Sequence, residues 1–302
     1  MWEKIFNHPL MERIGRVKEL LRGEFNFELL YTRVIVGTEF THDEKNSMKD
    51  VIRDSYKDLD QAIQSWLNDR SEINIDRFNS RILMCFTNRI KNKVSFFTPN
   101  QDLFIERYLK IGQVKWPGVS IIPSLGSYST LTDSDFVRLP GQKACEMIEN
   151  NLHISDGFPY VKLHGSYGWK SSDGSNAMVI GTSKKEDIEK EPLLKYYFHI
   201  FENAICEQSQ KLLIIGYSFG DPHVNEIIAN GVKLHGLRLY IIDPTPPKSF
   251  FNNLRSKPYG DQLCSGIERY WSDKLRDIFP LQDRITLLDT TKEDQIREAL
   301  FS

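Results

Sequence analysis

The sequence has few cysteines, no long apolar run and almost no net charge. Its 302 residues hold four widely spaced cysteines, with no Cys-x-x-Cys pair. They are Cys85, Cys145, Cys206 and Cys264. This spacing argues against a zinc site made of close cysteine pairs, and it suits single buried thiols in a reducing cytoplasm. No stretch approaches the roughly 20 apolar residues of a membrane helix, and the N-terminus lacks a signal-peptide pattern.

The charge balance also limits the class of partner. Lys and Arg number 39 against 41 Asp and Glu, a formal charge of −2, so the chain as a whole has no electrostatic footprint for duplex nucleic acid. Hydrophobic residues make up 40% and charged residues 26%, which is typical of a globular protein with a sizeable core. We therefore expect a globular cytoplasmic protein that does not bind membranes. Nucleic-acid binding is not indicated, and only a local basic patch would provide it.

The first third of the chain has helical periodicity. Apolar residues recur three or four positions apart over residues 43–69, which predicts one amphipathic helix. They are Met48, Ile52, Tyr56, Leu59, Ile63 and Trp66. Further helices are expected over residues 1–22 and 75–91. We expect residues 1–93 to form the helical part of a single domain.

From residue 94 onward, short apolar runs alternate with helical segments. The runs lie at residues 94–97, 119–122, 160–163, 178–180, 212–215, 239–242 and 285–288. Helices are expected near residues 101–110, 191–207, 222–232, 266–278 and 292–300. Such alternation predicts an α/β fold over residues 94–302, with a doubly wound, mostly parallel sheet and helices on both faces.

A histidine follows one of these runs directly. Residues 160–163 are strand-like, and His164, Gly165 and Ser166 come next. Ligands of α/β proteins bind outside the carboxyl ends of the strands, and a histidine there can transfer protons near neutral pH. The alternative is a histidine with a purely structural role.

A second polar motif follows the run at residues 94–97. Pro99 stops the strand, and Asn100 and Asp102 come at an expected helix start. Asn100 offers a donor and an acceptor to a ribose or a water. The alternative is that Asn100 is only an N-cap and that Asp102 favours the helix dipole.

Two more motifs follow strands near the C-terminal end of the chain. After residues 212–215, Gly216 lets the backbone approach a ligand and Ser218 can donate to a phosphate or ribose. Asp221 and Pro222 predict a helix start, so an ordinary β-to-α turn is a compatible interpretation. Asp243 follows residues 239–242, where an acid can hold ribose hydroxyls, or where it is simply a polar strand end.

Together these motifs resemble the Sir2 family. Residues 98–102 are similar to its Thr-x-Asn-x-Asp motif, residues 162–166 to its Leu-His-Gly-Ser motif, and residues 216–221 to the glycine-serine turn of the SIR2-like subgroup. The resemblance covers about residues 94–243. It is closest to the SIR2-like proteins of bacterial anti-phage defence.

The resemblance implies a Rossmann-like fold that binds NAD and breaks its nicotinamide–ribose bond. By similarity, His164 is the general base and Asn100 positions the water or the ribose. Asp102 would support the nicotinamide pocket, Gly216 and Ser218 the ribose-phosphate portion, and Asp243 the adenosine ribose. The resemblance thus implies these NAD-binding residues: Thr98, Asp102, Gly165, Gly216, Ser218 and Asp243.

Two departures from the family pattern shape the expected activity. The zinc-binding cysteine pairs of protein-deacylating sirtuins are absent, so no zinc is expected and hydrolysis is favoured over deacylation. No Gly-Ala-Gly-x-Ser loop occurs either, and residues 33–38 offer only one glycine. We expect this chain to start just after that loop. Three explanations are open: the protein starts upstream of Met1, it is a truncated or degenerate member of the family, or a partner supplies the missing strand. NAD binding by these 302 residues is then expected to be weak.

Three functions follow from the resemblance. The first is an NAD hydrolase that acts in anti-phage defence by depleting NAD, as a homo-oligomer or with a defence-complex partner. The second is a non-catalytic module that binds NAD, ADP-ribose or a partner protein. The third is a protein deacylase, which the missing cysteine pairs disfavour.

Overall fold

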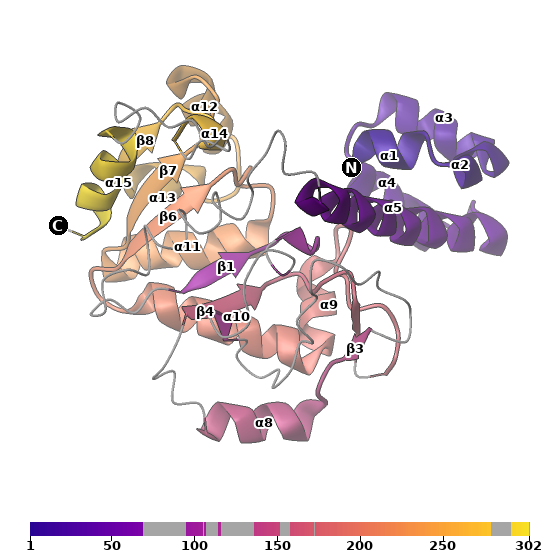
Figure 1. Ribbon diagram of the computed structural model, residues 1–302, viewed down its shortest axis with the longest axis horizontal. Helices are drawn as coiled ribbons and strands as arrows, with labels where there is room; N and C mark the ends of the chain where they lie inside the picture. The colour runs from indigo at the N-terminus through magenta and orange to yellow at the C-terminus, as the bar shows by residue number, and fades with distance from the viewer. Residues whose placement is uncertain are drawn as a thin grey trace. The chain divides into compact units, whose positions relative to one another are not determined.

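The computed structural model describes residues 1–68, 95–104, 106, 114–115, 136–151, 158–171, 173–278 and 291–301. The described chain divides into two compact units. The first contains residues 1–68 and the described residues from 96 to 197, and the second contains Ser95 and the described residues from 198 onward. Figure 1 labels the elements of both units. The boundary expected after residue 93 lies outside the described residues.

Five helices form the N-terminal part of the first unit. They are α1 (Trp2–Phe6), α2 (Pro9–Arg13), α3 (Gly15–Gly23), α4 (Phe27–Val36) and α5 (His42–Asn68). The long helix expected over residues 43–69 is therefore confirmed as α5, whereas residues 1–22 form short helices instead of one. A capping box starts α5, because the Glu44 side chain accepts from the Thr41 N–H and the Thr41 hydroxyl accepts from the Glu44 N–H.

These helices share one apolar core. Buried side chains from all five helices pack together, and Ile180 joins them from a distant part of the chain. The core members include Ile5, Met11, Val17, Leu30, Met48 and Val51. The segment around residue 180 is thus fixed against the N-terminal helices.

The strands of the first unit pair in parallel. Strands β1 (Phe96–Thr98), β4 (Phe158–Lys162) and β2 (Val114–Lys115) form a sheet in the order β1-β4-β2, and β3 (Val137–Arg138) pairs with β5 (Trp169–Lys170). Thr98 lies opposite Lys162, so β1 and β4 end side by side. Helices α8 (Gln142–Asn151) and α9 (Lys184–Lys190) complete this unit, which ends inside α10 (Pro192–Cys206).

The second unit contains a parallel sheet of strands β6 (Lys211–Ile215), β7 (Arg238–Ile242) and β8 (Ile267–Trp271), in that order. Its helices are α11 (Pro222–His235), α12 (Pro247–Arg255), α13 (Gly260–Ser265), α14 (Leu275–Ile278) and α15 (Thr291–Phe301). Figure 1 shows β6, β7 and β8 as neighbouring arrows. The strands predicted at residues 212–215 and 239–242 and the helices predicted near 191–207, 222–232 and 292–300 are confirmed.

Two expected elements are wrong. Residues 178–180 form no strand, because the Val179 N–H donates to the carbonyl oxygen of His164 and Ile180 packs into the helical core. The helix expected over residues 266–278 begins as strand β8, because pairing with β7 takes these residues into the sheet. The expectations at residues 75–91, 119–122 and 285–288 lie outside the described residues, as does half of 101–110.

The described residues therefore form a mixed fold of helices and short parallel strands, as expected for the α/β class. Among the described helices, none combines the length and the apolar character of a membrane span.

Candidate functional site

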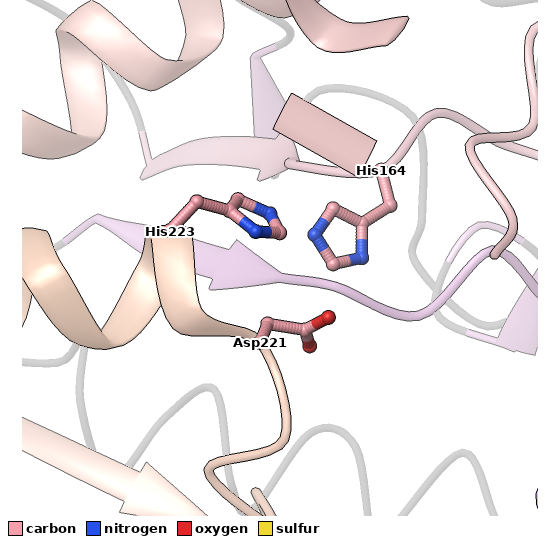
Figure 2. A group of neighbouring side chains, drawn as sticks. All are labelled: His164, Asp221 and His223. Atoms are coloured by element: carbon pink, nitrogen blue, oxygen red, sulfur yellow. The ribbon is translucent and has the colours of Figure 1, made fainter. Parts of the chain in front are cut away.

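His164 lies two residues beyond the end of β4, at the edge where β1 also ends. The Leu163 N–H donates to the Thr98 carbonyl oxygen at 2.9 Å, which ties the two strand ends together. The His164 side chain is buried, with 2% of its surface exposed. Figure 2 shows the His164 imidazole as sticks. The structure thus brings the Asn100 and His164 motifs to one carboxyl edge, where α/β proteins bind ligands.

Gly165 makes the sharp turn after His164. Its φ is +72°, in the left-handed region, and a Cβ atom there would lie 1.7 Å from the carbonyl oxygen of Ala177. One residue back, the His164 carbonyl oxygen accepts from the Val179 N–H at 2.9 Å. Only glycine meets both the conformational and the spatial demand, so Gly165 shapes the loop behind the histidine.

Gly165→Ala is expected to lower the free energy of unfolding by about 3 kcal/mol, because it combines a left-handed penalty with overpacking. The matched control is Gly174→Ala, where φ is +93° but no atom lies within 4 Å of the added Cβ. Gly174→Ala should lower the free energy of unfolding by about 1–2 kcal/mol, because only the penalty for a left-handed alanine applies there. Urea unfolding measures both, and equal losses would contradict the close contact with Ala177.

A buried ion pair lies beneath this motif. Lys162 has 0% of its surface exposed, and its Nζ lies 2.7 Å from Glu106 Oε1 and 2.9 Å from the Ser166 hydroxyl. It also donates to the Asp102 carbonyl oxygen. Burial raises the pKa of the Glu106 carboxyl, while the Lys162 ammonium acts in the opposite direction. The pair connects both strand-end motifs through one cation.

Tyr160 adds a second contact to the same carboxylate. Its hydroxyl donates to Glu106 Oε2 at 3.3 Å, and burial and the Glu106 charge raise its pKa well above the usual value. Sequence reasoning missed Glu106. A lysine inside a buried strand was the available signal, since a fully buried lysine is rare unless it is paired.

In the motif at residues 98–102, Thr98 and Asp102 make hydrogen bonds that hold the loop, whereas Asn100 is exposed. The Thr98 hydroxyl is buried and accepts from the Asn100 N–H at 3.0 Å. The hydrogen bond to the helix start comes from Asp102, whose Oδ1 accepts from the Phe104 N–H at 2.9 Å. Asp102 therefore makes the capping contact that the alternative interpretation gave to Asn100. The Asn100 residue is exposed at the sheet edge.

Gln101 is a further residue that sequence reasoning passed over. It is 5% exposed and contacts both motifs of this edge, since its side chain donates to the His164 carbonyl oxygen and its own carbonyl oxygen accepts from the Tyr167 N–H. It occupies a variable position of the Thr-x-Asn-x-Asp pattern, so the motif itself gave no signal for it.

The second unit has its own strand-end cluster. Gly216 follows β6 with φ +61°, its N–H donates to the Ile242 carbonyl oxygen at 3.1 Å, and no atom lies within 4 Å of a Cβ added there. Asp243 follows β7, and Ser218 is exposed in the loop after Gly216. Because Ile215 lies opposite Ile242, Gly216 and Asp243 are neighbours at the carboxyl edge of β6 and β7.

Asp243 is held by its own loop. Its Oδ1 accepts from the Thr245 N–H at 2.8 Å, and its carbonyl oxygen accepts from the Tyr270 hydroxyl at 3.1 Å. Burial and the Asp243 charge raise the pKa of Tyr270 to about 12. The tyrosine therefore stays protonated and keeps donating near neutral pH.

A buried asparagine fixes the loop between Gly216 and α11. Phe219 is 2% exposed with φ +54°, a left-handed conformation that is uncommon for a bulky residue. The Asn225 Nδ2 donates to the Phe219 carbonyl oxygen at 2.9 Å, and its Oδ1 accepts from the Tyr217 hydroxyl at 3.2 Å. Burial, followed by the Asp221 charge, raises the pKa of Tyr217. Asn225 thus stabilises a strained turn.

Asn225→Ala is expected to lower the free energy of unfolding by about 2–3 kcal/mol, because it leaves buried polar groups of the turn without this partner. Asn230→Ala is the control, since Asn230 is exposed on the same helix and should change stability by less than about 0.5 kcal/mol. Thermal unfolding followed by circular dichroism measures both variants. A similar loss in the two would show that the turn does not depend on Asn225.

Helix α11 begins as the sequence predicts, with Asp221 as N-cap and Pro222 in the first turn. Figure 2 shows Asp221 and His223 at this helix start. They offer a carboxylate oxygen and an imidazole nitrogen within 4.8 Å of each other, and the His223 ring lies 5.4 Å from the Phe198 ring. A carboxylate oxygen and an imidazole nitrogen are donor types that bind cations. The expectation that the protein holds no metal therefore stays a prediction.

Comparison with known protein families identifies the family of this chain. The SIR2-like domain model matches residues 94–260, which is more than half of the chain and includes all three motifs. No curated protein matches the chain. With His164 at the shared end of β1 and β4 and the family match over the same residues, the chain belongs to the SIR2-like domain family.

Proposed function

We propose that this protein is a SIR2-like NAD hydrolase that cleaves the bond between nicotinamide and ribose. The observation that carries the proposal is His164, a buried histidine placed beside the Asn100 motif at one strand edge of a SIR2-like domain. A histidine at such an edge is suited to act as a general base near neutral pH.

In the proposed reaction, the nicotinamide leaves with the bonding electron pair and the ribose carbon becomes cation-like. A water molecule adds to that carbon, and His164 accepts a proton from the water or from a ribose hydroxyl. The products are nicotinamide, ADP-ribose and a proton. Asn100 positions the water, while Thr98, Asp102 and Gly165 shape the nicotinamide end of the pocket, consistent with their roles in fixing the two loops.

The residues that follow β6 and β7 are proposed to bind ribose and phosphate groups of NAD. The open backbone at Gly216 and the exposed hydroxyl of Ser218 suit the ribose-phosphate portion, and Asp243 suits the adenosine ribose. A Rossmann-like, doubly wound sheet is the arrangement that we propose for the whole domain. NAD is the substrate, and no zinc is required for this chemistry.

The biological role that we propose is anti-phage defence through NAD depletion in the cytoplasm. The protein would act as a homo-oligomer or with a defence-complex partner. The absence of a Gly-Ala-Gly-x-Ser loop from the 302 residues favours one alternative, a non-catalytic module that binds NAD or ADP-ribose.

One experiment separates these functions. The protein is incubated with NAD while nicotinamide is quantified by chromatography, and NAD and ADP-ribose binding are measured in parallel by calorimetry. Nicotinamide release supports the hydrolase. Binding without release would favour the non-catalytic module, and neither binding nor release would contradict both.

A further inference from the structure

The Gln101 side chain uses all of its hydrogen-bonding groups in the buried region behind His164. Its Nε2 donates to the His164 carbonyl oxygen at 3.3 Å and to the Val179 carbonyl oxygen. Its Oε1 accepts from the Tyr56 hydroxyl at 2.8 Å. An amide nitrogen has two protons, and both are donated here. The amide plane is therefore fixed by three hydrogen bonds.

These partners fix which way the amide points. Turning it over would direct Oε1 at two carbonyl oxygens, which cannot donate to it. Burial, followed by the Asp102 charge, raises the pKa of Tyr56, so its hydroxyl keeps its proton and donates to Oε1. The orientation of Gln101 is therefore determined by its surroundings, as a support for a catalytic group requires.

The same contacts join the His164 loop to the N-terminal helices. Tyr56 belongs to α5, and Val179 belongs to the segment whose next residue, Ile180, packs in the helical core. A few residues further on, the Thr182 N–H donates to the Thr32 hydroxyl of α4 at 2.8 Å. The two residues that bond the His164 carbonyl oxygen, Gln101 and Val179, are thus connected to α5 through Tyr56 and to α4 through the segment that ends at Thr182.

We propose that Gln101 is a positioning residue for His164, which fixes the histidine through its backbone carbonyl group and does not contact the substrate. This inference rests on the proposed function of His164 as general base. Catalysis is sensitive to such placement, since a displacement of about 1 Å can lower a rate by about 100-fold.

The test replaces Gln101 by glutamate, which has nearly the same shape but directs a carboxylate oxygen at the two carbonyl groups. Nicotinamide release is measured to obtain kcat and KM separately. In parallel, the imidazole Cε1–H resonance of His164 is followed by NMR and assigned by its loss in His164→Gln. We expect Gln101→Glu to lower kcat about 100-fold with KM within about threefold, and to shift the His164 resonance.

The control for a purely structural effect is Val51→Ala. Val51 is fully buried in α5, so its truncation should lower the melting temperature while leaving kcat and the His164 resonance unchanged. If Gln101→Glu does not fold, Tyr56→Phe replaces it, because this change removes only the hydroxyl that orients the amide. We expect a smaller shift of the same resonance.

The outcomes separate the two proposals. Wild-type protein that releases no nicotinamide contradicts the hydrolase, but the His164 resonance still decides the role of Gln101. An unshifted resonance in folded Gln101→Glu, or in Tyr56→Phe where that variant fails to fold, would overturn the inference. A Gln101→Glu variant that keeps the wild-type kcat, as Val51→Ala is expected to do, would overturn it as well.

Discussion

His164→Gln is expected to lower the rate of nicotinamide release from NAD by at least about 100-fold, the lower range of the contribution of a general base. Glutamine has a similar size and keeps hydrogen-bonding groups, but it does not accept a proton near neutral pH. Because His164 is buried at the end of β4, the substitution tests its chemistry with little change in packing volume. Steady-state release of nicotinamide, measured at saturating NAD, gives the effect on kcat.

The matched control is His199→Gln, since His199 is exposed on α10. It should retain the wild-type rate. Melting temperatures of both variants establish that they are folded. If His164→Gln and wild-type protein release nicotinamide at the same rate, His164 has no part in the mechanism.

The largest expected effect on stability comes from the buried ion pair. Lys162→Met is expected to lower the free energy of unfolding by about 3–5 kcal/mol, because it leaves the Glu106 carboxylate buried without its cation. The Ser166 hydroxyl and the Asp102 carbonyl oxygen lose the same partner. Urea unfolding followed by tryptophan fluorescence measures the change.

Two further variants locate the cause of this loss. Lys162→Met combined with Glu106→Leu should recover much of the stability, because a buried pair replaced by apolar side chains is often neutral. Lys190→Met breaks the exposed pair with Asp187 on α9, whose atoms lie 2.9 Å apart, and should cost less than about 1 kcal/mol. Equal losses of unfolding free energy in Lys162→Met and Lys190→Met would contradict the explanation by a buried, unpaired carboxylate.

The sequence predicted the elements whose patterns are local. The runs that became β6 and β7 are continuous and apolar, and α11 carries its own start signal in Asp221 and Pro222. The motif residues at the ends of β1 and β4 were predictable for the same reason, since a polar residue directly after an apolar run marks a strand end. Parallel pairing then brings those ends together.

The helix expected over residues 266–278 failed because two patterns competed. Ile267, Trp271, Leu275 and Ile278 are spaced by three or four residues, which favours a helix. Residues 267–271 are also rich in aromatic and β-branched side chains, and pairing with β7 decides for a strand. The periodicity of one segment carries no information about pairing with another strand, so it did not predict β8.

The polar residues behind the motifs were missed for a related reason. Glu106 and Asn225 are buried because of partners that no short pattern contains. Gln101 illustrates the point most clearly, since its partners lie 45, 63 and 78 positions away along the chain. Such residues become recognisable only when the fold brings the partners together.

The central claim is the hydrolysis of NAD, and its most direct measurement is a mass balance of the reaction. Purified protein is incubated with NAD, and NAD, nicotinamide and ADP-ribose are quantified over time. We expect nicotinamide and ADP-ribose to form in equal amounts as NAD disappears, and His164→Gln to slow this reaction by at least about 100-fold. NAD that remains intact with folded wild-type protein would contradict the account.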